Sequence, residues 1–390
     1  MSAAPIHPGE IAIIMATRGR PEMLVQVFAS LKANTRRKEN VSVWIYVDAD
    51  DDLTRQAIDC GTLGDAGLPV HWHFGPQTPG LCETQHELWR QSGQTAELYV
   101  ISVDDARFDT PGWDDVARSA ATKYPDGLFL AAPFDPATAD TSTYPIFGWR
   151  WLQTLGQIFP GHFPYWFDDR WVHQIGVMAG RYEPLPIVMF PIRGKGRTRR
   201  MRDLPFWTRF FQLMLVERKN SAQTLIEAMN HEPQKKSEAL KQLDAQAAKF
   251  AKEQDKFSDL YAVFQEERFT LHPPEERRGF NAGYFQKEAQ AVGRLLEEAQ
   301  KLMAAGQPAE AMKYLDGTLM SNLRVQQAQD MKVACLRALG KNSTADQLEK
   351  ETIASWPRMN FARRLFRFLG MVASDGKTML IGFFQGGKKK

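Results

Sequence analysis

Short apolar runs alternate with helical patterns in the first half of the chain. The runs have the length and the β-branched and aromatic content of buried strands, and they cover residues 11–17, 41–48, 70–75, 97–105, 127–134 and 186–192. Apolar residues at helical spacing lie between them, over residues 21–34, 82–93 and 112–124. This alternation predicts an α/β fold with a mostly parallel sheet flanked by helices.

The composition changes near residue 215. Before Lys219 the chain holds 17 of its 22 prolines and nine of its ten tryptophans, whereas Ala, Gln, Glu, Lys and Leu predominate afterwards. Gly306 and Gly340 are 34 residues apart, which is the period of tetratricopeptide-type helical hairpins, with a short helical bundle as the alternative. The expected parts are an α/β domain over 1–215, a helical linker or bundle over 216–284, all-α helical hairpins over 285–355, and a basic tail over 356–390. We expect the helical part to bind a protein partner or a second copy of the chain.

The overall composition is that of an ordinary soluble globular protein, with 43% hydrophobic and 24% charged residues. No apolar run reaches the roughly 18 residues of a membrane-spanning helix, and the first residues lack the pattern of a secretory signal. Cys60, Cys82 and Cys335 form no CxxC pair, which favours reduced thiols over disulfides or a zinc site. These features predict a cytoplasmic protein.

The net charge of +3 conceals two basic segments on an otherwise acidic chain. Residues 193–202 hold six basic residues and no acid, and residues 356–390 hold eight basic residues and one acid. Local cationic segments suit local anionic partners, whereas a nucleic-acid binder is more often basic over a whole face, so no nucleic-acid partner is expected. On a helical wheel, residues 361–372 place arginines opposite an aromatic and aliphatic face. That pattern predicts contact with an anionic membrane surface at its inner face; the alternative is a last helix packed on the domain.

Polar residues gather where the predicted first strand ends. The segment ATRGRP (16–21) places Arg18 and Arg20 directly after an apolar strand, with Gly19 between them. Arginine forks match phosphate oxygens, and the N-terminus of the following helix adds favourable partial charge. The segment therefore predicts a phosphate site, with a solvated turn as the alternative.

The second strand ends in the acidic segment VDADDD (47–52). Asp51 or Asp52 suits a helix N-cap. Asp48 is the last residue of the apolar strand, where a carboxylate can accept hydrogen bonds from a base or a ribose.

Two further acidic pairs follow. Asp104 and Asp105 end a strand that reads as buried, and hard oxygen ligands of this kind suit Mg²⁺ or Mn²⁺; capping of the turn at 111–112 is the alternative for one of them. Asp168 and Asp169 lie among aromatic residues, where a raised carboxyl pKa suits a general base, and His173 follows on the same helical face. A capped helix start is the alternative for this second pair.

In their order and spacing, these segments resemble the nucleotide-sugar glycosyltransferases of the GT-A fold, especially the family-2-like bacterial group, over roughly residues 10–195. The chain reads Ser-Val-Asp at 102–104 in place of the family's Asp-x-Asp, so a metal would depend on Asp104 and Asp105. The resemblance implies a nucleotide-sugar site at Thr17, Arg18, Arg20, Asp48, Asp50 and Asp104, a metal site at Asp105, Asp104 and His173, and a catalytic base at Asp169 or Asp168.

The same resemblance implies the reaction. A sugar would pass from a nucleotide-diphosphate donor to a glycan or glycolipid acceptor, with Mn²⁺ or Mg²⁺ as cofactor and inversion at the anomeric carbon, in surface polysaccharide synthesis. Two alternatives stay open. One is a catalytically inactive scaffold that acts through its helical repeats. The other is a sugar-phosphate nucleotidyltransferase, which would need a Gly-rich first loop, whereas ATRGRP has a single glycine.

Overall fold

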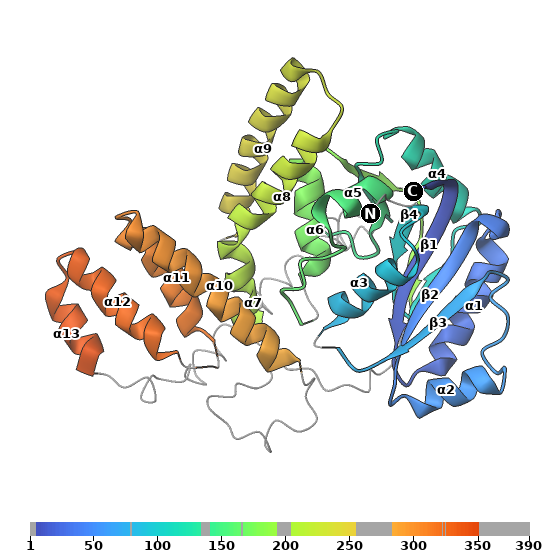
Figure 1. Cartoon of the computed structure of the whole chain (residues 1–390), viewed down its shortest axis with the longest axis horizontal. Helices are drawn as coiled ribbons and strands as arrows, with labels where there is room; N and C mark the ends of the chain where they lie inside the picture. The colour runs from blue at the N-terminus through green and yellow to red at the C-terminus, as the bar shows by residue number, and fades with distance from the viewer. Residues whose placement is uncertain are drawn as a thin grey trace, which may run out of the picture. The chain divides into compact units, whose positions relative to one another are not determined.

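The structure is a computed structural model that describes residues 5–78, 80–133, 141–164, 167–192, 204–254, 283–321, 323 and 325–350 (Figure 1). The described residues divide into two compact units. The first unit holds 5–192, 215–249 and 283–287, and the second holds 204–214, 250–254 and 288–350.

A seven-stranded sheet forms the centre of the first unit, with the strand order β3-β2-β1-β4-β7-β6-β8. Its strands are β1 (His7–Thr17), β2 (Val41–Asp48), β3 (Val70–Gly75), β4 (Ala96–Ile101), β6 (Leu130–Pro133), β7 (Ile146–Gly148) and β8 (Tyr182–Leu185). β7 runs antiparallel to both of its neighbours, and every other pair is parallel. A second, two-stranded antiparallel sheet joins β5 (Ala106–Phe108) to β9 (Met189–Pro191).

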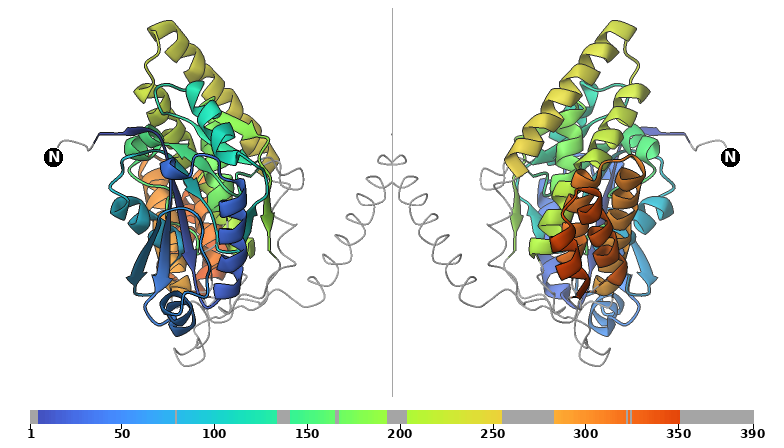
Figure 2. Two further views of the ribbon diagram at one scale, coloured as in Figure 1. Left: turned by 90° about the vertical axis from the view of Figure 1, so that its right-hand side faces the viewer. Right: turned by 90° about the vertical axis from the view of Figure 1, so that its left-hand side faces the viewer.

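Helices of the first unit lie on the sheet and beside it, as the two side views in Figure 2 show. They are α1 (Pro21–Asn34), the 3-10 turn η1 (Lys38–Asn40), α2 (Asp52–Asp59), α3 (Leu81–Gln91), α4 (Trp113–Thr122), α5 (Trp149–Leu155), α6 (Asp168–Met178), α8 (Leu215–Ala228) and α9 (Pro233–Gln254), of which residues 250–254 belong to the second unit. The prediction of an α/β fold with a mostly parallel sheet flanked by helices is confirmed. α1 has the predicted bounds, and α3 and α4 lie within two residues of theirs.

The core explains why the central strands read as continuous apolar runs. Ile13 and Ile14 are both fully buried although their side chains leave opposite faces of β1. Leu24 and Val27 of α1 are buried in the same core cluster as Ile13. A strand covered on both faces carries no polar alternation, which is the pattern of a buried parallel strand.

Three short strands were not predicted from the sequence. β5 and β7 have three residues each and β8 has four, so none shows enough positions for a periodic pattern. The predicted strands at 127–134 and 186–192 contain the shorter β6 and β9.

The second unit is helical. Its elements are α7 (Leu204–Leu213), all but the first turn of α10 (Tyr284–Ala304), α11 (Pro308–Leu319), α12 (Gln326–Ala338) and α13 (Asn342–Lys350). α11 packs on α12, and α12 packs on α13. Gly306 and Gly340 both adopt the left-handed conformation after a helix, with φ of 71° and 73°. The helices and the two glycine turns agree with the predicted hairpins, and the tetratricopeptide relationship stays a prediction.

The expected division at residue 215 differs from this grouping. α8 packs on α5 and α6, so it belongs to the first unit. Arg218 of α8 is fully buried there; its Nε donates to Gln174 Oε1 at 2.8 Å and its guanidinium lies over the ring of Trp171. The basic segment 193–202 and the tail 356–390 lie outside the described residues. Within the described ranges, no helix is both long enough and apolar enough to cross a membrane.

Replacing Gly148 by alanine tests the close packing at the end of β7. A Cβ added there would lie 2.8 Å from the ring of Phe129 and closer still to the carbonyl oxygen of Gly127. We expect Gly148→Ala to lower the free energy of unfolding by about 1–3 kcal/mol, because the backbone must move to make room. Gly293→Ala, inside α10 with open space around its Cβ, is the control and should be neutral or stabilising. Equal melting temperatures for Gly148→Ala and the wild type would contradict this packing.

Candidate functional site

Three parallel strands deliver polar residues to one edge of the sheet. β1 ends at Thr17, β2 ends at Asp48 and β4 ends at Ile101. β1 pairs with both of the others in parallel register, so the three carboxyl ends point the same way. Beyond β4, the Ser102 amide donates to the carbonyl oxygen of Ile14 in β1 at 2.9 Å. This hydrogen bond directs the residues that follow Ser102 toward Thr17.

Arg18 joins the first of these ends to the second. Its Nη1 donates to Asp48 Oδ2 at 2.7 Å and to Asp50 Oδ1 at 2.5 Å, and its Nη2 donates to Asp50 Oδ2 at 2.8 Å. Burial raises the pKa of Asp48 in spite of Arg18, whereas the hydrogen bonds of Arg18 lower the pKa of the exposed Asp50. The structure therefore brings together three of the predicted nucleotide-binding side chains.

Asp51 has a structural role at the same turn. It caps α2 by accepting from the Thr54 amide at 3.2 Å, and its Oδ2 also accepts from the Gly19 amide at 2.6 Å. Gly19 has a φ of +63°, a conformation that glycine adopts without strain. The prediction that Asp51 or Asp52 caps this helix is confirmed for Asp51.

Arg20 joins the first strand end to the third. Its Nη2 donates to Asp104 Oδ1, and its Nη1 donates to Asp105 Oδ2 at 2.9 Å. The hydroxyl of Thr17 donates to the second oxygen of Asp104 at 2.7 Å. The Asp104 side chain is fully buried, and burial raises its pKa to about 6 against the opposing effects of Arg20 and Thr17. Both oxygens of Asp104 are thus engaged by the protein itself.

This arrangement bears directly on the predicted metal. Two adjacent carboxylates are suitable ligands for Mn²⁺ or Mg²⁺, but Arg20 holds one oxygen of each. Among the residues that the structure describes, no three His, Cys, Asp or Glu side chains are grouped so as to hold a metal. His173 does not join Asp104 and Asp105, because its ring packs at 4.5 Å from that of Tyr182 and its Nδ1 lies 3.2 Å from Ser142 Oγ. The aspartate pair fits a metal only when Arg20 turns away.

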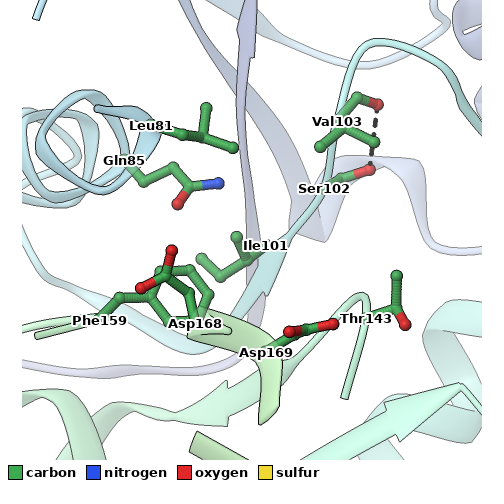
Figure 3. A pocket seen from close by; sticks show the side chains of 9 residues that line it. All are labelled: Leu81, Gln85, Ile101, Ser102, Val103, Thr143, Phe159, Asp168 and Asp169. Carbon is green, nitrogen blue, oxygen red and sulfur yellow. Dashed lines mark hydrogen bonds between the residues drawn. The ribbon is translucent and has the colours of Figure 1, made fainter. Parts of the chain in front are cut away.

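A pocket of about 160 Å³ lies beside this network, and Figure 3 shows the side chains that line it. Ser102 and Val103 line it and immediately precede Asp104 and Asp105, so one short segment serves both the pocket and the network. The described residues that line it are Leu81, Gln85, Ile101, Ser102, Val103, Thr143, Phe159, Asp168 and Asp169.

Asp168 and Asp169 enter the pocket from the first turn of α6. The residue before them, Phe167, has a φ of +71°, which is strained for a side chain of this size. Its buried ring packs 5.5 Å from that of Phe163, and this packing accompanies the strained turn. The turn therefore sets the direction in which the two carboxyl groups leave the helix.

The two carboxyl groups have different surroundings. Burial of its carboxyl group raises the pKa of Asp168 well above its ordinary value, although a hydrogen bond from the Cys82 thiol opposes this shift. Asp169, which like Asp168 is partly exposed as a whole residue, accepts at its Oδ1 from the Arg170 amide at 2.7 Å. The raised pKa makes Asp168 harder to ionise than an ordinary aspartate, so these surroundings favour Asp169 over Asp168 as a proton acceptor.

Sequence reasoning missed Gln85, Thr143 and Phe159. The sequence did contain a signal for Gln85. It lies on the buried side of α3 with Leu88 and Trp89, where a polar residue is unusual. Phe159 and Thr143 lie outside helices and strands, so no periodic pattern marks them.

No family model matches the chain, and no curated protein matches it. Solved structures similar to it include S. aureus TarS 1–349 in complex with UDP, with 11% identity, a TM-score of 0.43, and coverage of 90% of this chain and 94% of that one. Another is the mannosyltransferase PcManGT from Pyrobaculum calidifontis in complex with GDP-Man and Mn²⁺, with 16% identity, a TM-score of 0.42 and coverage of 90% of each chain. At these values the likeness carries no conclusion about the activity of this chain.

Asp104→Asn tests the buried carboxyl group. Its pKa of about 6 exceeds that of an unfolded aspartate, so between the two values the folded protein binds the proton more tightly. The stability that this proton provides is complete below the unfolded pKa and is lost as the pH rises through about 6. From about pH 4 to about pH 7, we expect the wild type to lose about 1–3 kcal/mol more of its free energy of unfolding than Asp104→Asn does.

Urea denaturation at a series of pH values measures this difference. The exposed Asp59→Asn is the control and should follow the wild type. Parallel stability curves for Asp104→Asn and the wild type would show that Asp104 is not held in the manner described.

Proposed function

We propose that this chain is a glycosyltransferase that uses a nucleotide-sugar donor. The observation that carries the proposal is the convergence of Arg18, Arg20, Asp48, Asp104 and Asp105 at one edge of the sheet, beside a pocket that contains a partly exposed carboxylate. A donor of this class has two parts, a charged nucleoside diphosphate and an uncharged sugar. The charged network and the adjoining pocket match those two parts.

The network would bind the nucleoside diphosphate. Arg18 and Arg20 present guanidinium groups that pair with phosphate oxygens as well as they pair with carboxylates. Asp48, buried at the end of β2, would accept hydrogen bonds from the base or the ribose, with Asp50 beside it. Thr17 would keep Asp104 in place through the hydroxyl bond already present.

Asp104 and Asp105 would hold Mn²⁺ or Mg²⁺ once Arg20 has turned toward the diphosphate. The cation would supply positive charge for the leaving diphosphate. In its absence, Arg20 neutralises the aspartate pair and keeps the two loops together. Arg20 and the cation therefore compete for the same carboxylate oxygens.

Asp169 would accept the proton of the acceptor hydroxyl. As that oxygen forms its bond to the anomeric carbon, the bond from this carbon to the diphosphate oxygen breaks, and the diphosphate leaves with the electron pair. A single direct displacement inverts the anomeric configuration. The strained turn at Phe167 holds the base in position.

The acceptor and the cellular location are proposed from the sequence resemblance and the basic tail. We propose a glycan or glycolipid acceptor of surface polysaccharide synthesis, and a peripheral position on the inner face of the cell membrane through the basic tail 356–390. The helical second unit would bind a protein partner or a second copy of the chain.

Asp169→Asn tests the base. Removing it should lower kcat by about 10²- to 10⁴-fold while nucleotide binding is kept, because a general base acts on the acceptor proton alone. Asp168→Asn should lower kcat far less, since the amide keeps one oxygen and the raised pKa of the parent carboxyl group already favours its uncharged form. Asp52→Asn, an exposed first-turn aspartate of α2, is the matched control.

Transfer to an acceptor, or hydrolysis of the nucleotide sugar, measures kcat, and calorimetry with UDP and GDP measures nucleotide binding. A larger loss in Asp168→Asn than in Asp169→Asn would reverse the two roles. Unchanged turnover in both variants would remove the carboxylates from the reaction.

Competition for the aspartate pair is tested by Mn²⁺ titration followed by electron paramagnetic resonance. Without nucleotide, Arg20→Gln should bind Mn²⁺ about tenfold more tightly than the wild type, because the guanidinium no longer occupies the carboxylate oxygens. Asp105→Asn should bind it more weakly than the wild type. Arg107→Gln is the control, since Arg107 pairs with Asp109 outside this network. Equal Mn²⁺ affinity in all four proteins would exclude the aspartate pair as the cation site.

A further inference from the structure

Among the described residues, the pocket beside the network has no basic side chain in its lining. Its titratable members are the carboxyl groups of Asp168 and Asp169, which offer no positive charge to a phosphate group. Leu81, Ile101 and Phe159 supply an apolar wall. An uncharged occupant with both apolar and hydroxyl-bearing surface fits this lining, and about 160 Å³ limits it to roughly one sugar ring.

One end of the pocket presents two buried acceptors that lack donors. Gln85 is only 2% exposed, and neither its Oε1 nor Asp168 Oδ1 has a hydrogen-bond partner among the described residues. They come from different helices, α3 and α6, and Figure 3 shows the amide and the carboxyl group turned toward one another. The carboxylate of Asp169 points away from this end of the pocket and is turned toward Thr143.

Buried acceptors without donors are costly. Each such group loses its hydrogen bonds to water without replacement, which destabilises the folded protein. Native proteins keep few of them, and two at one end of a cavity are explained when a ligand provides the missing donors. The donors must be uncharged or positive, and they must lie close enough together to reach both oxygens.

We propose that Gln85 and Asp168 form the sugar-recognition end of this pocket, where Gln85 Oε1 and Asp168 Oδ1 accept hydrogen bonds from hydroxyl groups of one saccharide ring. This inference rests on the proposed function, and it adds Gln85 as a specificity-determining residue. Neighbouring hydroxyl groups of a ring provide two donors at a short spacing, and the C–H face of the ring suits the wall formed by Leu81 and Phe159.

The state of Asp168 agrees with this role. Burial of the carboxyl group raises its pKa, which favours the uncharged form, and that form has an acceptor oxygen and no charge that must be desolvated. Recognition and proton transfer then belong to different residues of the same helical turn, because Asp169 is turned to the other side.

The ring has two sources, the transferred sugar of the donor and a sugar of the acceptor. Both present the same hydroxyl chemistry, and different probes distinguish them. In the donor arm, calorimetry compares UDP and GDP with UDP-glucose, UDP-N-acetylglucosamine and GDP-mannose. In the acceptor arm, saturation-transfer NMR follows methyl glucosides and methyl mannosides in the presence of UDP or GDP.

Gln85→Met is the test variant, because methionine has a similar length and no acceptor. Gln91→Met is the matched control on the same helix, since Gln91 is exposed and bonds to Glu87. Gln85→Met should bind UDP and GDP as the wild type does. It should bind at least one sugar probe about tenfold more weakly, in the donor arm or in the acceptor arm, and that arm identifies the source of the ring.

Thermal unfolding without ligand gives an independent readout. Since Gln85 Oε1 has no partner to lose, Gln85→Met should melt no lower than the wild type. A clearly lower melting temperature would show that Gln85 has a structural role and would overturn the inference. Equal sugar binding by Gln85→Met and the wild type in both arms would overturn it while leaving the proposed function intact. A wild type that binds neither nucleotides nor nucleotide sugars would overturn both.

Discussion

Arginine–carboxylate pairing at the strand ends is the interaction on which the site depends. Asp48, Asp50, Asp104 and Asp105 reach one edge of the sheet, where their charges would repel one another without cations between them. Arg18 and Arg20, from the loop after β1, supply those cations and join three loops. Burial of such pairs contributes little net stability, because desolvation offsets much of the attraction. These pairs keep charged side chains at the site, where they can interact with a charged ligand.

The fold places this charged edge beside a pocket whose lining suits an uncharged group. The segment from Ile101 to Asp105 leaves β4, lines the pocket with its first residues and enters the arginine network with its last. A ligand that fills both places is charged at one end and neutral at the other. Within the pocket the two carboxyl groups of α6 differ, since burial raises the pKa of the Asp168 carboxyl group and the Asp169 carboxylate is turned to the opposite side. A nucleotide sugar with an incoming hydroxyl group meets each of these conditions.

Sequence reasoning could predict the central strands, the helix over 21–34 and the clustering of acids at strand ends, because buried parallel strands are apolar along their whole length and end at a common edge. It could not predict that Arg18 and Arg20 bind those acids in the protein itself, since pairing depends on how loops distant in the sequence meet. The difference between Asp168 and Asp169 arises from burial, which a shared motif does not reveal. For His173 the resemblance implied a metal ligand, with a buried structural histidine as the alternative; its ring is buried and packs on Tyr182.

The most direct measurement of the central claim is proton NMR of the reaction products formed from a panel of UDP- and GDP-sugars by the full chain. The account predicts release of the nucleoside diphosphate together with a sugar product, free or attached to the acceptor, of inverted anomeric configuration. Retention of configuration would contradict the single displacement by Asp169. Intact donors throughout the panel, with no binding of any of them, would contradict the assignment of the network to a nucleotide sugar.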